Sequence, residues 1–396
     1  DTGTGTGEDP FGELIIEQVF LPGMSMGEAA LVVGPDGTAV LIDVANDGHS
    51  SFVLEAIDRR LNSRQVDWIV LTHYHNDHIG ALDNLLLPSI ANGNDPVVVT
   101  RGIVSRGLVD VGEDMVAVED FVEFCEILED AATDGLRVDL CEGPASAGCN
   151  GGVTGAPWPA GGCPGLLRGD LSSPIDDDEG RLAFVPLGGG ARLYLCQANA
   201  HLAQEQDVIS AADHGLAIGH GATHPENARS LGCMIRWGDF TYTQNGDTTG
   251  DIPALESFIA ARQAAILVAP DGLPLLPEGA ADVVHLSHHG LPSATSQAWV
   301  DWLLPEDGAS RNAVVGITAM YFQSPAQAVL DRVGPRVQDG WIWATTLGLL
   351  PGSHPRLKDV EGSIVVRVDT GGASYQMCAL VGSVEGEVQQ YQSTSP

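Results

Sequence analysis

Basic residues are scarce in this chain. Lys358 is its only lysine, and 18 basic side chains face 53 acidic ones, for a formal net charge of -35 over 396 residues. The densest basic groups are only Arg59 and Arg60 with Arg64, and Arg101 with Arg106. So acidic a surface repels polyanions and argues against a general nucleic-acid binder. Adaptation to salt or export would produce the same acidity, so charge alone does not identify a substrate.

Long apolar runs are also lacking. No segment approaches the roughly 20 residues that a membrane-spanning helix needs, so we expect a soluble protein. The first ten residues, DTGTGTGEDP, have neither the basic start nor the apolar core of a signal peptide. We interpret residues 1–13 as a flexible tether left after removal of a leader, which favours a secreted or periplasmic location.

Paired C-x-x-C motifs are missing, although the chain has seven cysteines. Three of them, Cys141, Cys149 and Cys163, punctuate a Gly/Pro/Ala-rich insert at about residues 141–180 that shows no helical or strand period. Such a segment needs cross-links to hold a shape, so we expect at least one disulfide among these three rather than a metal site. Cys196 and Cys233 lie in apolar runs and are predicted to be buried.

Short β-rich runs dominate what is present. Residues 14–20, 28–34 and 38–44 are separated by Gly, Pro and Asp, which predicts an antiparallel meander. A helical period over 50–64 and a buried strand at 66–72 follow.

The second half of the chain repeats this order of strands followed by alternating helices and strands. The pattern predicts a single α/β domain over 14–385, a four-layer αββα sandwich interrupted by the insert, and a C-terminal tail at 386–396.

The richest cluster of polar residues directly follows the strand at 66–72. His73, His75, Asp77 and His78 are imidazoles and a carboxylate, which are ligands for zinc and neighbouring metals. Alternation of side chains in extended backbone places His73 and His75 on one side, and a turn lets Asp77 and His78 face a second ion. We therefore predict two divalent metal ions, zinc or manganese, that activate a water between them.

This H-x-H-x-D-H pattern after a strand resembles the metallo-β-lactamase superfamily, and the resemblance covers nearly the whole chain outside the insert. Asn245-Gly246-Asp247 ends a later strand, where the resemblance implies that Asp247 bridges both metals. The stretch 281–290, with Asn227 and Ser230 ahead of the strand at 231–237, is similar to one branch of the superfamily. That branch contains the hydrolase domain of the competence DNA-uptake channel and bacterial phosphorylcholine esterases.

The resemblance also implies further histidine ligands. A third ligand of the first metal comes from the loop before 231, where His224 has the expected spacing to Asp247 and His220 is the alternative. One of His288 and His289 binds the second metal, and the other supports it or contacts substrate.

Some features fit the resemblance less closely or not at all. His285 is expected to be a buried core residue, and His201 and His214 to be surface residues. Two departures from the branch stand out. Residues 319–325 lack the asparagine and histidine usual there, and His75 replaces a common aspartate.

These observations lead to a secreted binuclear hydrolase, with a small phosphodiester as the expected substrate and a metal-bridging hydroxide as the nucleophile. Asp77 would orient that nucleophile, and an imidazole of His288 or His289 would protonate the leaving group. The same site could hydrolyse a lactone, a β-lactam or another acyl bond. The motifs are also compatible with a nuclease, and with a non-catalytic extracellular protein that only binds metal.

Overall fold

A computed structural model describes residues 12–105, 184–202, 230–249, 281–306, 311–316 and 323–393, except 24–25, 90–92, 94 and 199–200. Outside these ranges it describes only residues 124, 127, 138–139, 226–227 and 276. The predicted insert at 141–180 and nearly all of the predicted tether at 1–13 therefore lie outside the described residues.

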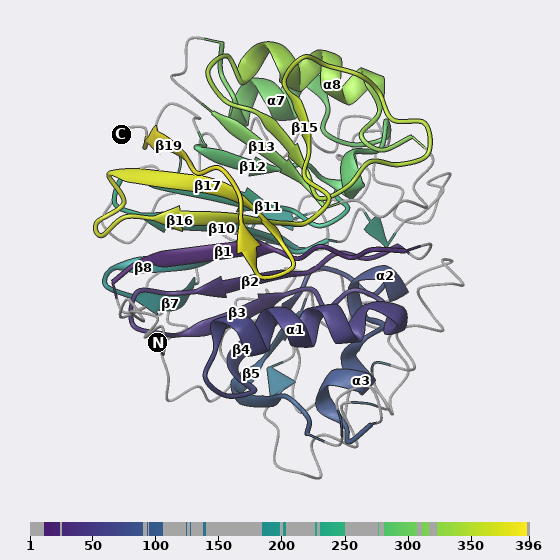
Figure 1. The fold of residues 1–396 in the computed structure, drawn as a ribbon, viewed down its shortest axis with the longest axis vertical. Helices are drawn as coiled ribbons and strands as arrows, with labels where there is room; N and C mark the ends of the chain where they lie inside the picture. Colours follow the sequence, from purple (N-terminus) through teal and green to yellow (C-terminus); the bar gives the residue numbers. More distant parts are fainter. Residues whose placement is uncertain are drawn as a thin grey trace, which may run out of the picture.

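Two large mixed sheets form the centre of the molecule (Figure 1). The first sheet has ten strands in the order β18-β17-β16-β1-β2-β3-β4-β5-β6, with β19 also paired to β17. Its strands are β1 (Leu14–Gln18), β2 (Ala30–Val33), β3 (Ala39–Ile42), β4 (Gln65–Leu71), β5 (Val98–Ser105), β6 (Val138–Asp139), β16 (Ser363–Val368), β17 (Ser374–Val381), β18 (Val384–Glu385) and β19 (Gln389–Gln392).

The second sheet has nine strands in the order β15-β14-β13-β12-β11-β10-β8-β7, with β9 paired to β8. Its strands are β7 (Phe184–Gly188), β8 (Ala191–Ala198), β9 (His201–Leu202), β10 (Gly232–Trp237), β11 (Phe240–Gln244), β12 (Val283–His285), β13 (Asn312–Val315), β14 (Ile342–Ala344) and β15 (Leu357–Asp359).

Helices cover the outer face of each sheet (Figure 1). On the first sheet these are α1 (Ser50–Arg60), α2 (Asn76–Ile79) and α3 (Leu82–Leu86), and on the second α7 (Gln297–Leu303) and α8 (Gln327–Val333). None of the helices among the described residues is long and apolar enough to cross a membrane.

Alternation along the strands builds three apolar layers. In β1, Leu14 and Ile16 join a core that also contains Leu193 and Ile235 of the second sheet. Ile15, between them, points the other way into the core shared with α1. A third core packs the second sheet against α7 and α8. Because both faces of each sheet are buried, the chain forms the predicted αββα sandwich.

The predicted antiparallel meander is confirmed, since β2 pairs with both β1 and β3 in antiparallel register. The helix expected at about 79–87 is instead two short helices, α2 and α3. Within the segment predicted to be a tail, β19 pairs with Ser374–Met377 of β17. These bonds extend the first sheet beyond the hairpin of β16 and β17, which the sequence does predict.

The parallel parts of the two sheets determine where the site lies. In the first sheet β3, β4 and β5 run parallel, and in the second β11 through β15 do. Loops that follow the carboxyl ends of parallel strands collect at one edge of a sheet. Those after β4, β11 and β12 carry the candidate ligands.

Candidate metal centre

The turn after β4 brings the predicted histidines together. His73 and His78 are fully buried and His75 is 9% exposed. His73 Nε2 lies 3.0 Å from His75 Nδ1, and the rings of His73 and His78 are 4.1 Å apart between centroids. Three imidazoles packed this closely in the interior are near enough to one another to bind metal ions.

Asp43, at the end of β3, holds this turn in place. Its Oδ1 accepts from the Thr72 backbone N–H (2.7 Å), and its Oδ2 accepts from Thr72 Oγ1 (2.8 Å). His78 Nδ1 lies 2.8 Å from the same Oδ2. The carboxylate therefore fixes the ring so that His78 Nε2 points away from Asp43, towards Asp247.

Asp247 lies at the centre of the arrangement. It follows β11 after Gly246, whose positive φ of 49° and contact with Thr72 leave no room for a side chain. Its Oδ1 is 3.3 Å from His78 Nε2 and 3.7 Å from His289 Nε2. Its Oδ2 is 3.8 Å from His73 Nε2. One carboxylate thus faces both groups of histidines.

The structure separates the roles of the two histidines after β12. Both have a left-handed backbone, with φ of 51° and 52°, which turns their side chains in different directions. His289 is fully buried, and its Nε2 lies 3.4 Å from Asp77 Oδ2. His289 is therefore the member of the pair that could ligate the second metal.

His288 is placed differently, with 12% of its side chain exposed. Its Nδ1 is 3.1 Å from Ser293 Oγ, and its Nε2 is 3.2 Å from Asn227 Nδ2. Its Nε2 is also 3.6 Å from Asp247 Oδ2. His288 thus lies beside the cluster, next to the asparagine that the sequence pattern singled out.

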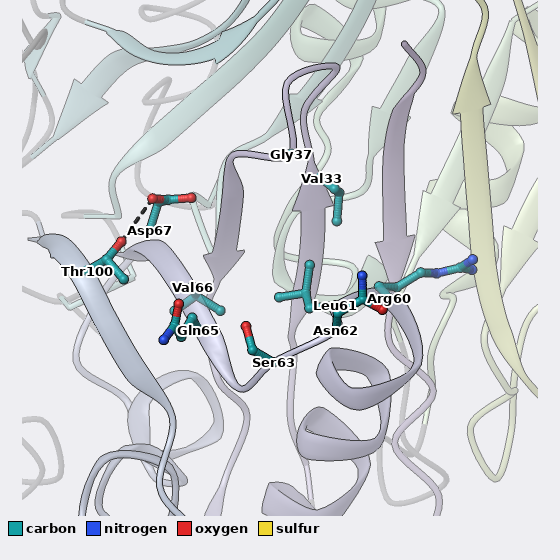
Figure 2. A pocket seen from close by; sticks show the side chains of 10 residues that line it. All are labelled: Val33, Gly37, Arg60, Leu61, Asn62, Ser63, Gln65, Val66, Asp67 and Thr100. Atoms are coloured by element: carbon teal, nitrogen blue, oxygen red, sulfur yellow. Dashed lines mark hydrogen bonds between the residues drawn. The ribbon is translucent and has the colours of Figure 1, made fainter. Parts of the chain in front are cut away.

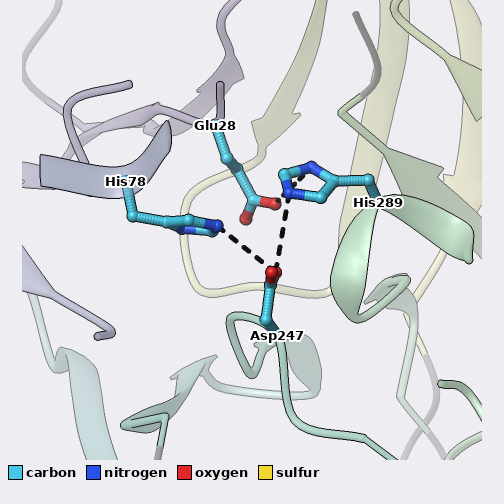
Figure 3. Close-up of side chains that lie close together, drawn as sticks. All are labelled: Glu28, His78, Asp247 and His289. Atoms are coloured by element: carbon cyan, nitrogen blue, oxygen red, sulfur yellow. Dashed lines mark ion pairs between the residues drawn. The ribbon is translucent and has the colours of Figure 1, made fainter. Parts of the chain in front are cut away.

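Glu28 is the acid that sequence reasoning missed. It precedes β2, is fully buried, and points with His78, Asp247 and His289 towards a common centre (Figure 3). The available signal was its position in the apolar run 28–34, since a buried carboxylate is costly without a cationic partner.

The ligand atoms form two clusters that share Asp247. One contains His73, His75 and Asp247, and the other contains Glu28, His78, Asp247 and His289, each with its ligand atoms within 4.8 Å of one another. His78 Nε2 and Asp247 Oδ1 are buried with no hydrogen-bond partner, although they face each other. Divalent cations would satisfy these atoms, so the residues fit a dinuclear metal site.

The charges of the site are strongly perturbed. Burial opposes ionisation of Asp247, but His288, His78 and His289 outweigh it, so the pKa of Asp247 lies well below its usual value. Burial would lower the pKa of His289, yet Asp247, Asp77 and Glu28 raise it to about 9. By contrast, burial holds the pKa of His73 well below its usual value. Clustered shifts of opposite sign are typical of functional sites.

Several other residues singled out in the sequence lie outside the described residues or outside the two ligand clusters. His220, His224 and His214 lie outside the described residues, as do Cys141, Cys149 and Cys163. His285 is buried, as expected, and its Nε2 is 3.5 Å from Glu28 Oε1. Cys196 and Cys233 are buried free thiols, which confirms that prediction.

A cavity of about 230 Å³ lies at the opposite end of β4 (Figure 2). It is lined by Gln65 and Asp67 of β4, by Arg60 and Ser63, and by Thr100 of β5, whose hydroxyl donates to Asp67. Because β4 leads from this cavity at Gln65 to the histidines beyond Leu71, the cavity is separate from the metal centre.

The N-terminal part of the chain matches one family model. Residues 26–92, which include Glu28, Asp43 and the four residues of the histidine turn, match the family model of the metallo-beta-lactamase superfamily. No curated protein matches the chain.

Similar solved structures are distant. They include the short form of human tRNase Z, 14% identical, covering 69% of this chain and 77% of that one, with a TM-score of 0.30. A variant of a metallo-β-lactamase from Cronobacter sakazakii is 13% identical, covering 69% and 76%, with a TM-score of 0.30. CmlA, a diiron β-hydroxylase from Streptomyces venezuelae, is 12% identical, with a TM-score of 0.38; the match covers 91% of this chain but 55% of CmlA. At this distance none of them transfers a substrate or a residue's role.

Proposed function

We propose that this chain, a member of the metallo-β-lactamase superfamily, is a dinuclear metal-dependent hydrolase that cleaves a small phosphodiester. The observation that carries the proposal is the pair of buried ligand clusters joined by Asp247. When bound, two divalent cations would lower the pKa of water at the site and neutralise charge on a phosphoryl oxygen. Zinc or manganese suits the imidazoles of the first cluster.

In this proposal, two side chains handle protons and the attacking water. Asp77, beside His289, is 12% exposed and is the carboxylate that would orient the water. His288 is in reach of both Asp247 and the solvent side, where a leaving oxygen would lie. Burial lowers the pKa of His288, which makes its protonated form a stronger acid towards that oxygen.

Electrostatics favours a small substrate over a nucleic acid. The four arginines that form the densest basic groups of the described residues all pair with acids. Arg59 and Arg60 contact Glu17 at 2.7 and 2.6 Å, Arg64 contacts Asp58 at 2.8 Å, and Arg101 contacts Asp67 at 3.3 Å. Arginines neutralised within the protein cannot release cations from a phosphate backbone, which is the main driving force of DNA binding.

A substrate panel tests the proposal. The metal-loaded protein would be assayed with bis-p-nitrophenyl phosphate, a phosphocholine ester, a phosphomonoester, a lactone, a β-lactam and single-stranded DNA, with zinc and with manganese. We expect the diesters to be turned over fastest. Faster acyl hydrolysis would favour a lactonase or β-lactamase instead.

The DNA arm is run at low and high salt, because salt screens repulsion beyond roughly 10 Å. If DNA is cut faster per site than any small ester even at low salt, the electrostatic argument is wrong. No turnover of any substrate by protein that holds two metals would favour a non-catalytic metal-binding protein.

We further propose that the protein is exported and that its insert carries at least one disulfide among Cys141, Cys149 and Cys163. The support is the composition of the insert, with its three cysteines in a Gly/Pro/Ala-rich stretch. Mass spectrometry of unreduced protein should show this bridge, with Cys196, Cys233 and Cys378 remaining as thiols. Free thiols at all three insert positions would argue for a protein of a reducing compartment.

A further inference from the structure

Glu28 is fixed by both its backbone and its side chain. Its N–H donates to the Asp77 carbonyl (2.9 Å), and its own carbonyl accepts from the Ala45 N–H (2.9 Å). Gln244 Nε2 donates to Glu28 Oε1 at 2.9 Å. The segment before β2 is thereby tied to the turn that carries Asp77, and one carboxylate oxygen is committed to Gln244.

The second carboxylate oxygen, Oε2, is buried and has no hydrogen-bond partner. The carboxylate is directed into the cluster of His78, Asp247 and His289 (Figure 3). His289 Nδ1 lies 3.5 Å from Oε2, but that nitrogen makes its hydrogen bond with the Gly316 carbonyl at 3.3 Å. A buried carboxylate oxygen without a hydrogen-bond partner destabilises the fold unless a cation binds it.

Asp43, a second buried acid behind the cluster, provides a contrast. Both of its oxygens are satisfied, by Thr72 and by His78 Nδ1, so its carboxylate can only orient the ring. Glu28 is not needed to orient a ring in this way, because the Gly316 carbonyl already holds His289. The two acids therefore have different roles, although both are buried and lie beside a histidine.

We propose that Glu28 binds the second metal ion directly through Oε2, as a ligand additional to Asp77, His78, His289 and Asp247. The inference rests on the proposed dinuclear centre. A set of three carboxylates and two imidazoles is richer in oxygen than tetrahedral structural or catalytic zinc sites. Such a set suits a five- or six-coordinate ion of the manganese(II) or iron(II) class at the second position, beside a histidine-bound first ion.

Metal titration without substrate tests this assignment. Metal-free wild type, Glu28→Gln and Asp43→Asn would each be titrated with Mn²⁺ by calorimetry. The same proteins would be loaded with Co²⁺, whose visible absorption reports coordination number. Asp43→Asn is the matched control, since it removes a buried acid that only orients a ligand.

We expect Glu28→Gln to weaken binding of the second metal ion by more than about 100-fold. This exceeds the roughly 10- to 100-fold loss of affinity that is typical when a residue only orients a ligand. The first equivalent should change little, and the Co²⁺ absorption of the second site should intensify as a ligand is lost. Asp43→Asn should weaken binding but leave that absorption unchanged.

Two results would overturn the assignment. One is unchanged second-site affinity in Glu28→Gln, and the other is weakened affinity with an unchanged Co²⁺ spectrum, which would make Glu28 an orienting residue like Asp43. If Glu28→Gln does not fold, Glu28→Asp retracts the carboxylate while keeping its charge and should show the same spectral change. Wild type that binds fewer than two ions would instead refute the dinuclear centre itself.

Discussion

Metal binding at the second site should release protons, and the number can be worked out from the site. The pKa of His289 is raised to about 9, because Asp247, Asp77 and Glu28 outweigh the effect of burial. The pKa of His78 is raised well above its usual value by Asp247, Asp43 and Asp77, again against burial. At pH 7 both imidazoles of the metal-free protein are therefore protonated. His289 is about 99% protonated at that pH, because pH 7 is two units below its pKa.

Only the unprotonated imidazole binds a metal, so the second ion must displace about two protons from His78 and His289 at pH 7. Burial raises the pKa of Glu28 to about 7, so this ligand should release about half a proton more. The apparent affinity for the second ion should accordingly rise about 100-fold for each pH unit. This dependence should weaken as the pH approaches 9, where His289 loses its proton even without metal. The first site should behave differently. The pKa of His73 lies well below its usual value, so this ligand is already neutral and has no proton to release.

Calorimetry in buffers of different ionisation enthalpy measures this release. The slope of observed heat against buffer ionisation enthalpy gives the number of protons released per ion, and at pH 7 we expect between two and three for the second ion. A slope below one, or an affinity that stays flat between pH 6.5 and 8.5, would show that the histidines are not held protonated by the acids around them.

Four substitutions test the shared carboxylate, proton donation by His288 and the packing of the core. Asp247→Ala should cost both metals in elemental analysis, whereas His78→Ala should chiefly cost one; equal losses would contradict a shared carboxylate. His288→Ala should keep both metals but slow cleavage of alkyl leaving groups by about 10²- to 10⁴-fold, with p-nitrophenolate, which needs no proton, far less affected. A uniform loss would argue against proton donation. Ile42→Ala, at a fully buried position, should lower the free energy of unfolding by about 2–5 kcal/mol in denaturant titrations, and a change below 1 kcal/mol would contradict the packing described.

Features that depend on neighbouring residues were predictable from the sequence. The spacing of His73, His75, Asp77 and His78 after a buried strand is local, because side-chain direction follows from extended backbone and a following turn. The meander of β1 to β3 and the hairpin of β16 and β17 follow likewise from alternation between turn residues. The split between α2 and α3 was missed because a short apolar period does not reveal a break in the helix.

The sequence does not decide which of His288 and His289 is the metal ligand. The two residues are adjacent in a turn, and sequence spacing does not tell which side chain enters the interior. Their left-handed backbone and the partners Asn227 and Ser293, which hold His288 near the surface, make the distinction.

By itself, the sequence determined the strand-and-helix pattern and the local ligand motif, since each depends on residues a few positions apart. Only the tertiary structure decided which distant residues complete the centre. Glu28 precedes β2, Asp247 follows β11 and His289 follows β12, and they meet because the carboxyl ends of strands from two packed sheets converge. The burial that gives Glu28 its importance arises from that packing, so no pattern within one segment could have shown it.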